Sequence, residues 1–288
     1  MIMASWHAPC IPEPRCAVYL LVAESDMASS RKSAPPEDLS QHPVVAATYP
    51  GFAVRPDTQV PLREQASSVL ERLLSLRDPM SGLTHFVGGV MALAGLPVLL
   101  ATVANPFRPW HFVSFAVFGT ALFLLYAAST LFHWLPASRE GIVRLRKLDH
   151  IMIFIFIAAT YTPFCLVPFR GPFGWTMLCC IWTIALCGSV FKLFWIHVPK
   201  WLCLSLYLCA GWFSLVGTGH ILRTLQPGAI MWLLGGGASY CLGALFYALE
   251  KADDPPVLFG YHEVFHLFVI LGSCAHFWVM YRYITAFS

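Results

Sequence analysis

Long apolar blocks separated by short polar stretches make up the chain from residue 83 onward. Each block holds about 17–23 residues, close to the length of helix that crosses the hydrocarbon layer of a bilayer. Because lipid offers the backbone no hydrogen-bonding partner, blocks this long are predicted to be helices. The seven blocks are residues 83–104, 110–131, 151–167, 174–195, 201–222, 229–249 and 264–286.

The composition supports this interpretation. Hydrophobic residues make up 58% of the 288 residues and charged residues 11%, whereas soluble domains carry about 25% charged residues. So little polar surface excludes a water-soluble globule. The sequence therefore predicts an all-α membrane protein, with a bundle of seven transmembrane helices over residues 78–288. Its expected partners are membrane lipids, and no nucleic-acid partner is expected.

The first 77 residues have a different composition. They are rich in Pro, Ser and Ala and contain no spanning block, which predicts a disordered cytoplasmic extension. Within it, residues 63–76 carry apolar side chains at helical spacing, which is typical of a short amphipathic helix lying on the membrane surface. The alternative is a leader segment with little structure.

Lys and Arg near the membrane are divided unequally, nine on the side of the N-terminus against four on the other. Because positive charge collects on the cytoplasmic side, we expect the N-terminus inside and the C-terminus outside a bacterial inner membrane. The nine are Arg72, Arg77, Arg139, Arg144, Arg146, Lys147, Lys192, Lys200 and Lys251, and the four are Arg108, Arg170, Arg223 and Arg282. Lys192 lies near a block end, where its ammonium is expected to reach the membrane surface.

Four ionisable residues lie where the blocks meet the cytoplasmic face. His133 ends the second block, Asp149 opens the third, and His262 and His266 open the seventh. Ionisable groups at membrane depth are costly and are candidates for function. The alternating direction of the spans brings all four to the same depth, although they are far apart in sequence.

Their spacing favours a metal site near the cytoplasmic face. His262 and His266 are four residues apart on one helical face, and Ser129 and His133 have the same spacing. Three imidazoles with one open position are the usual arrangement of catalytic zinc, and imidazole suits Zn²⁺ better than Ca²⁺ or Mg²⁺. Asp149 is then expected to orient a zinc-bound water or to accept its proton.

Two further patterns involve the same side of the membrane. The segment His262-Glu263-Val264-Phe265-His266 also fits the zinc-protease pattern, in which Glu263 would be the general base. His85 opens the first block on that side and either lines the mouth of the site or is an interfacial residue. His276 lies on the stripe of His262 but is roughly 20 Å deeper, too far for it to bind the same ion.

At these residues the chain resembles the bacterial hemolysin III family, which is related to the progestin and adiponectin receptor family and to alkaline ceramidases. The motifs that carry the resemblance are Leu83-Thr84-His85, Ser129-Thr130-Leu131-Phe132-His133, Lys147-Leu148-Asp149-His150, Ala159-Thr160-Tyr161-Thr162-Pro163 and His262-Glu263-Val264-Phe265-His266.

The resemblance implies seven helices around a zinc ion held by His133, His262 and His266. It places Asp149 and Ser129 beside the zinc-bound water as catalytic residues. Before the first His, the family often carries Glu and Asn, where this chain has Asp78 and Ser81.

Three functions follow as hypotheses. The first is zinc-dependent hydrolysis of a lipid amide or ester that enters from the bilayer. The second is a receptor or regulator in which zinc is structural. The third is a cytolytic pore, as the family name implies, although the sequence has no amphipathic pore-forming segment.

Overall fold

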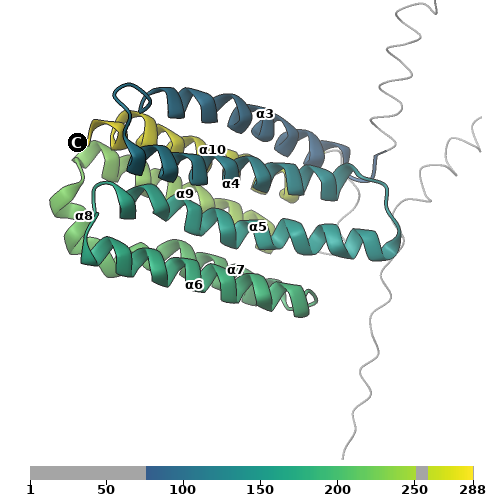
Figure 1. Ribbon diagram of the computed structural model, residues 1–288. Helices are drawn as coiled ribbons and strands as arrows, with labels where there is room; N and C mark the ends of the chain where they lie inside the picture. Colours follow the sequence, from purple (N-terminus) through teal and green to yellow (C-terminus); the bar gives the residue numbers. More distant parts are fainter. Residues whose placement is uncertain (1–75, 251–258, 288) are drawn as a thin grey trace, which may run out of the picture. The chain divides into compact units, whose positions relative to one another are not determined.

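A computed structural model describes residues 76–250 and 259–287. In these ranges the chain is almost entirely helical, and the predicted surface helix at 63–76 lies outside them apart from its last residue. The helices are α3 (Pro79–Ala101), α4 (Pro109–Trp134), α5 (Arg139–Leu166), α6 (Pro172–Phe194), α7 (Lys200–Gly211), η1 (Trp212–Gly217), α8 (Thr218–Thr224), α9 (Pro227–Leu249), α10 (Tyr261–Arg282) and η2 (Ile284–Ala286) (Figure 1).

Seven helical segments are long and apolar enough to cross a membrane, which confirms the predicted number of spans in the described residues. Five of the segments are the single helices α3, α4, α5, α6 and α9. The fifth span, Lys200–Thr224, is not one regular helix, because the 3-10 segment η1 separates α7 from α8. The last span joins α10 to η2.

The helix starts follow simple local rules. α3, α4, α6 and α9 each begin with a proline, whose fixed φ suits the first helical position and whose missing N–H would be unpaired there anyway. α5 begins twelve residues before the predicted block at 151–167, where Ser138 accepts a hydrogen bond from the Gly141 N–H. Its first turns carry too many charges for lipid, so a hydropathy pattern alone misses them.

The spans pack as a closed ring of neighbours. α3 packs on α4, α4 on α5, α5 on α6, and the ring continues through α7, α9 and α10 back to α3. Figure 1 shows these helices side by side. The α10–α3 contact brings the last span beside the first, so the start of α3, the end of α4 and the start of α10 meet at one end of the bundle.

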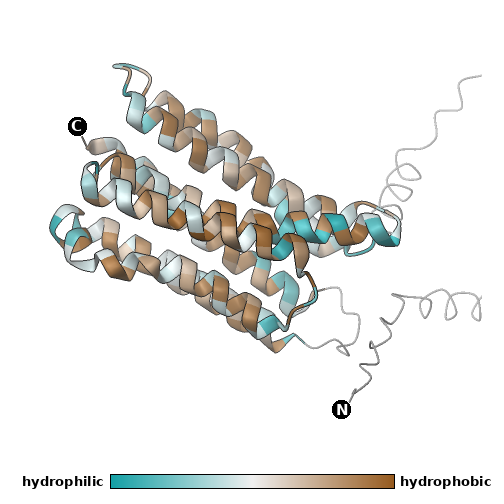
Figure 2. Cartoon of the chain, turned by 60° about the horizontal axis from the view of Figure 1, so that its bottom comes forward, coloured by the Kyte–Doolittle hydropathy of each residue, from teal (hydrophilic) through white to brown (hydrophobic). Residues whose placement is uncertain are grey.

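Apolar side chains cover much of the outside of the bundle. Leu186, Val216 and Met231 are 65%, 74% and 72% exposed, which suits a surface solvated by lipid. Figure 2 shows the hydrophobic colour along the middle of the helices and the hydrophilic colour gathered toward their ends. The buried interior between α4 and α5 is filled by large side chains, including Phe118 and Phe156.

A candidate metal centre

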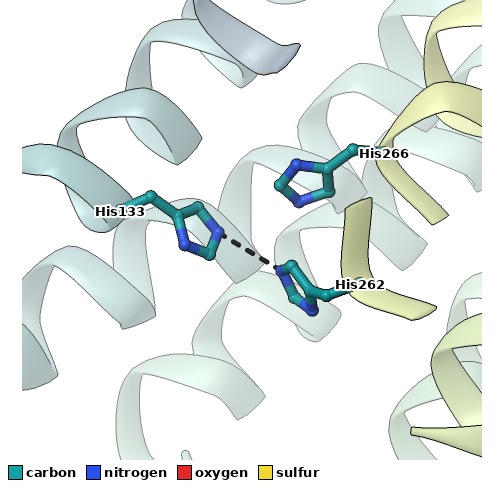
Figure 3. A group of neighbouring side chains, drawn as sticks. All are labelled: His133, His262 and His266. Carbon is teal, nitrogen blue, oxygen red and sulfur yellow. Dashed lines mark hydrogen bonds between the residues drawn. The ribbon is translucent and has the colours of Figure 1, made fainter. Parts of the chain in front are cut away.

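His133, His262 and His266 lie together at the end of the bundle where α3, α4 and α10 meet. One ring nitrogen from each lies within 4.8 Å of the others, and Figure 3 shows the three rings turned toward one another. His133 and His266 are buried, and His262 is half-buried. Of the four residues predicted to share one depth, the structure thus brings the three histidines together.

The helix ends place the three rings. α4 ends at Trp134, one residue after His133, and α10 begins at Tyr261, one residue before His262. His266 follows on the next turn of α10, so its ring lies on the same face as that of His262. The ring centroids of His262 and His266 are 4.6 Å apart.

The hydrogen-bond partners of the rings determine which nitrogen faces the centre. The Nδ1 of His133 lies 3.3 Å from the Asp78 carboxylate, and the Nδ1 of His262 lies 3.4 Å from Glu250. The Nδ1 of His266 lies 3.1 Å from both the Ser81 carbonyl and the Thr84 hydroxyl. These partners are oxygen acceptors, so each Nδ1 carries the hydrogen and each Nε2 keeps its lone pair.

One pair of the three ring nitrogens has the spacing of two ligands of a tetrahedral metal ion, and the third nitrogen lies within 4.8 Å of both. The Nε2 atoms of His133 and His262 are 3.3 Å apart. Two nitrogens bound to one tetrahedral zinc at about 2.0–2.1 Å would be separated by roughly the same distance. Without a cation between them the two lone pairs would repel. Histidines that bind metals donate their other ring N–H to a carboxylate or carbonyl in the same way.

The two carboxylates beside the cluster are held by cations. Arg77 Nε lies 3.0 Å from Asp78, and Lys200 Nζ lies 2.9 Å from Glu250. Burial raises the pKa of Asp78, but its hydrogen bond to His133 and the charge of Arg77 help to outweigh burial and lower that pKa. Burial likewise opposes ionisation of Glu250, but His262 and Lys200 lower its pKa to about 2. Both groups are therefore carboxylates at neutral pH.

Glu263 has a structural role in this geometry. One carboxylate oxygen accepts the Gly260 N–H at 2.7 Å, at the first turn of α10. The other accepts the Ser81 hydroxyl at 2.5 Å. The side chain thus caps α10 and ties it to α3, and both of its oxygens are engaged away from the three histidines.

His85 lies directly against the cluster. Its ring stacks on His266, with the centroids 3.5 Å apart and the planes 12° apart. The Tyr126 ring approaches its edge at 5.1 Å. Of the two interpretations left open by the sequence, these contacts favour a residue that lines the site, and the His85 side chain is only 4% exposed.

The two predicted catalytic residues have different surroundings. Ser129 is buried in α4, one turn before His133. Asp149 lies about three turns into α5 rather than at its start, and its carboxylate is 3.8 Å from the Nδ1 of His150. No direct contact joins it to the three histidines in the described part of the chain. Tyr247 links the two regions, because its ring lies 5.8 Å from that of His262 and Asp149 is one of its charged neighbours.

Lys192 does not extend to the membrane surface as predicted. It is 1% exposed, and its ammonium lies 2.7 Å from the sulfur of Cys203 on α7. α6 packs against α5 and α7, so the side chain is covered by its neighbours.

Sequence reasoning missed the Nδ1 partners of two of the histidines. Asp78 stood out only as the residue at the family's Glu position, and Glu250 was not singled out. Both are acidic residues at the boundary of an apolar span on the side of the histidines. An acidic residue at such a boundary is the sequence signal that could have identified these two partners.

Seven apolar spans and three converging imidazoles define a multi-span membrane protein with a candidate metal centre. The chain belongs to the Haemolysin-III related family, whose model matches residues 75–277.

Curated relatives agree with this assignment. The chain is 34% identical over 205 residues to the Hemolysin-3 homolog of Bacillus subtilis (strain 168), covering 70% of this chain and 92% of that protein. It is 34% identical over 208 residues to Hemolysin-3 of Bacillus cereus, covering 71% and 90%. A more distant relative is the Monocyte to macrophage differentiation factor of Homo sapiens, 26% identical over 182 residues, covering 61% and 72%.

Proposed function

We propose that this protein is a zinc-dependent hydrolase that cleaves an amide or ester bond of a lipid from within the bilayer. The observation that carries the proposal is the convergence of three imidazoles, each with Nδ1 beside an oxygen acceptor and with one ring nitrogen of each within 4.8 Å of the others. Lipid is the proposed substrate because the spans on which the site is built expose apolar side chains to the membrane.

In the proposed reaction, different residues of the chain would have different roles. His133, His262 and His266 would hold the ion, and Asp78 and Glu250 would keep two of the rings in the required tautomer. Bound zinc lowers the pKa of water to about 7 and polarises a carbonyl. Asp149 is proposed to accept the proton, from the side of the site occupied by Tyr247, and Ser129 to donate a hydrogen bond one turn deeper than His133.

A second candidate is a receptor or regulator with a structural metal. It is favoured by the way the cluster joins three helices, with His133 on α4, two ligands on α10, and bonds from α10 to Ser81 on α3. An ion held there would fasten the last span to the first two. In that case the metal would stabilise the fold without any turnover.

Metal analysis and a lipid-hydrolysis screen test the two candidates. The purified full-length protein is expected to contain one zinc per chain and to release fatty acid from at least one acyl amide or ester in mixed micelles. Asp149→Asn should retain zinc and lose most of the turnover. Retained zinc with no hydrolysis of any acyl lipid would favour the structural metal. A protein without stoichiometric zinc would contradict both.

The cytolytic activity implied by the names of the Bacillus relatives requires a separate assay. Release of a dye from pure-lipid vesicles by the purified protein would support a pore. With the hydrolase, no release is expected from vesicles whose lipids the protein does not cleave.

We also propose that the N-terminus is cytoplasmic and the C-terminus outside, in a bacterial inner membrane. The excess of Lys and Arg on the N-terminal side supports this orientation. A reporter fused after Ser288 should be active only if it works outside the cytoplasm. An active cytoplasmic reporter at that position would reverse the orientation and move the histidines to the outer face.

A further inference from the structure

Two buried side chains beside the histidine cluster carry polar atoms that the chain does not satisfy. They are the two ring nitrogens of His85 and the hydroxyl of Tyr126, none of which makes a hydrogen bond of normal geometry in the described residues. The two residues are only 4% and 2% exposed. An unpaired buried polar group costs about 1–3 kcal/mol, and Phe at either position would avoid that cost.

Both side chains are held in place by packing. The His85 ring is fixed between the face of His266 and the edge of Tyr126. Tyr126 in turn lies against α3 at Gly88, where a Cβ atom would come within 3.1 Å of the tyrosine ring. The small residue at 88 therefore allows the aromatic ring to approach α3. The unpaired polar atoms of His85 and Tyr126 therefore have fixed positions beside the cluster.

These groups lie on the inner side of the cluster. Tyr126 is seven residues before His133 on α4, and Ser273 is seven residues after His266 on α10, so each lies about two turns, or roughly 10 Å, deeper in the bundle. Tyr126 has Ser273 and Tyr240 as polar neighbours, and its contact with Ser273 is at most a weak hydrogen bond because it falls short of normal hydrogen-bond geometry. The Ser273 and Tyr240 hydroxyls are themselves 3.1 Å apart.

The two sides of the cluster differ in charge. On the side of the helix ends the histidines meet the carboxylates of Asp78 and Glu250, each paired with a cation. On the inner side, the polar neighbours described above are the imidazole of His85, the phenols of Tyr126 and Tyr240, and the hydroxyl of Ser273. Phosphate and carboxylate groups are recognised by Arg, Lys or helix N-termini. Neutral groups that can both donate and accept match a hydroxyl or an amide.

We propose that His85 and Tyr126 form a recognition site for an uncharged hydroxyl or amide group of the lipid whose acyl bond lies at the three histidines. The inference rests on the proposed function and names the substrate class more closely, as a lipid with a neutral polar group. His85 and Tyr126 act as specificity residues that hold this group, and hydrogen bonds to it supply the partners that the chain lacks.

Binding of a lipid that cannot be hydrolysed tests the proposal. The probe is 1-O-hexadecylglycerol, which is neutral, carries hydroxyl groups and has no ester or amide bond. The comparison lipids are hexadecanoate and hexadecyl phosphate. Thermal unfolding of the full-length protein in detergent gives the affinity from the rise in Tm with probe concentration. We expect the neutral lipid to raise Tm and the two charged lipids to do so much less.

Two variants and a matched control locate the binding. Tyr126→Phe and His85→Phe should each weaken binding of the neutral lipid by roughly tenfold, which corresponds to one lost hydrogen bond. The zinc content should stay unchanged. Tyr126→Phe should also leave the Tm of the lipid-free protein unchanged or higher. The control is Tyr161→Phe, since the Tyr161 hydroxyl donates to the Gly211 carbonyl and accepts the Ser214 N–H. It should lower the lipid-free Tm and leave the lipid affinity unchanged.

Several outcomes would overturn the inference. They are wild-type affinity in Tyr126→Phe, equal binding of hexadecyl phosphate, or no rise in Tm with the neutral lipid, which would leave water as the only partner of these groups. If His85→Phe fails to fold, the lipid affinity of Tyr126→Phe is sufficient to test the proposal. A protein that binds the neutral lipid through Tyr126 but contains no zinc would refute the proposed function and leave this recognition site standing.

Discussion

The end of the bundle formed by α3, α4 and α10 differs sharply from the span formed by α7, η1 and α8. The most apolar part of the α4 span is 56% buried, against 17% for Lys200–Thr224. At the histidine end, polar side chains bond across the fold, as Ser81 does with Glu263, 182 residues away. In the other span Thr218 bonds the Leu215 carbonyl three residues away, and the longer-range bonds of Gly211 and Ser214 run to Tyr161 on α5. The two regions thus differ in which spans their polar contacts join, because only the contacts at the histidine end described here fasten the last span to the first.

The largest effect is expected when one of the three histidines at this end of the bundle is removed. His133→Ala leaves two imidazoles, so we expect zinc affinity to fall by more than the 10–100-fold typical of an outer partner, together with a lower Tm. His220→Ala, in α8, is the control because its ring packs on two phenylalanines far from the cluster, Phe173 at 4.3 Å and Phe169 at 5.4 Å. Metal content and Tm are measured in parallel on both variants. Zinc that is indifferent to His133 would rule out the three-histidine centre.

The carboxylates that orient the rings should have the next largest effect. Asp78→Asn and Glu250→Gln keep the size of each side chain but remove its charge, and we expect zinc affinity to fall about 10–100-fold in each. Competition with a chelator of known affinity gives the change. Glu140→Gln is the matched control, since Glu140 is exposed and its ion pair in the described residues is with Arg144. Equal affinity in the control and in both variants would show that the outward hydrogen bonds do not matter.

A smaller effect is expected at Glu263. Because its carboxylate caps α10 and bonds Ser81, Glu263→Gln should lower stability by about 0.5–2 kcal/mol, the value of a helix cap. Zinc content and any hydrolysis should remain. Complete loss of hydrolysis in a folded variant that still holds zinc would instead establish Glu263 as the general base of a protease-like site.

The smallest change is expected far from the histidines. Lys192→Met replaces a buried ammonium with an apolar side chain of similar length, and the cost of burying the charge disappears with it. Unfolding free energy should therefore stay the same or rise. A loss of about 3–5 kcal/mol would mean that Lys192 and Cys203 form a buried ion pair, since breaking such a pair costs that much.

The sequence predicts the seven spans and the three histidines well, for physical reasons. Apolar runs must match the bilayer, and the i, i+4 spacing of His262 and His266 already places them on one face. The contact with His133 follows from the alternating direction of the spans. These features depend on length and periodicity alone.

Other features depend on packing that periodicity does not encode. The start of α5 at Arg139 was missed because a charged helix that leaves the membrane looks like a loop in a hydropathy pattern. The partners of His133 and His262 lie just outside the spans, at Asp78 and Glu250, where the path of the chain decides which side chains meet. The burial of Lys192, which the pattern predicts to reach the membrane surface, depends on a neighbouring helix that periodicity does not place.

The distance in sequence between the histidines also has a consequence for biosynthesis. His133 and His262 are 129 residues apart, and a ribosome adding about 5–20 residues per second needs roughly 6 to 26 seconds to cover that interval. Through this time the second span is complete while its counterpart has not been made. The centre can therefore close only when the final span enters the membrane, so metal loading would report that insertion has been finished.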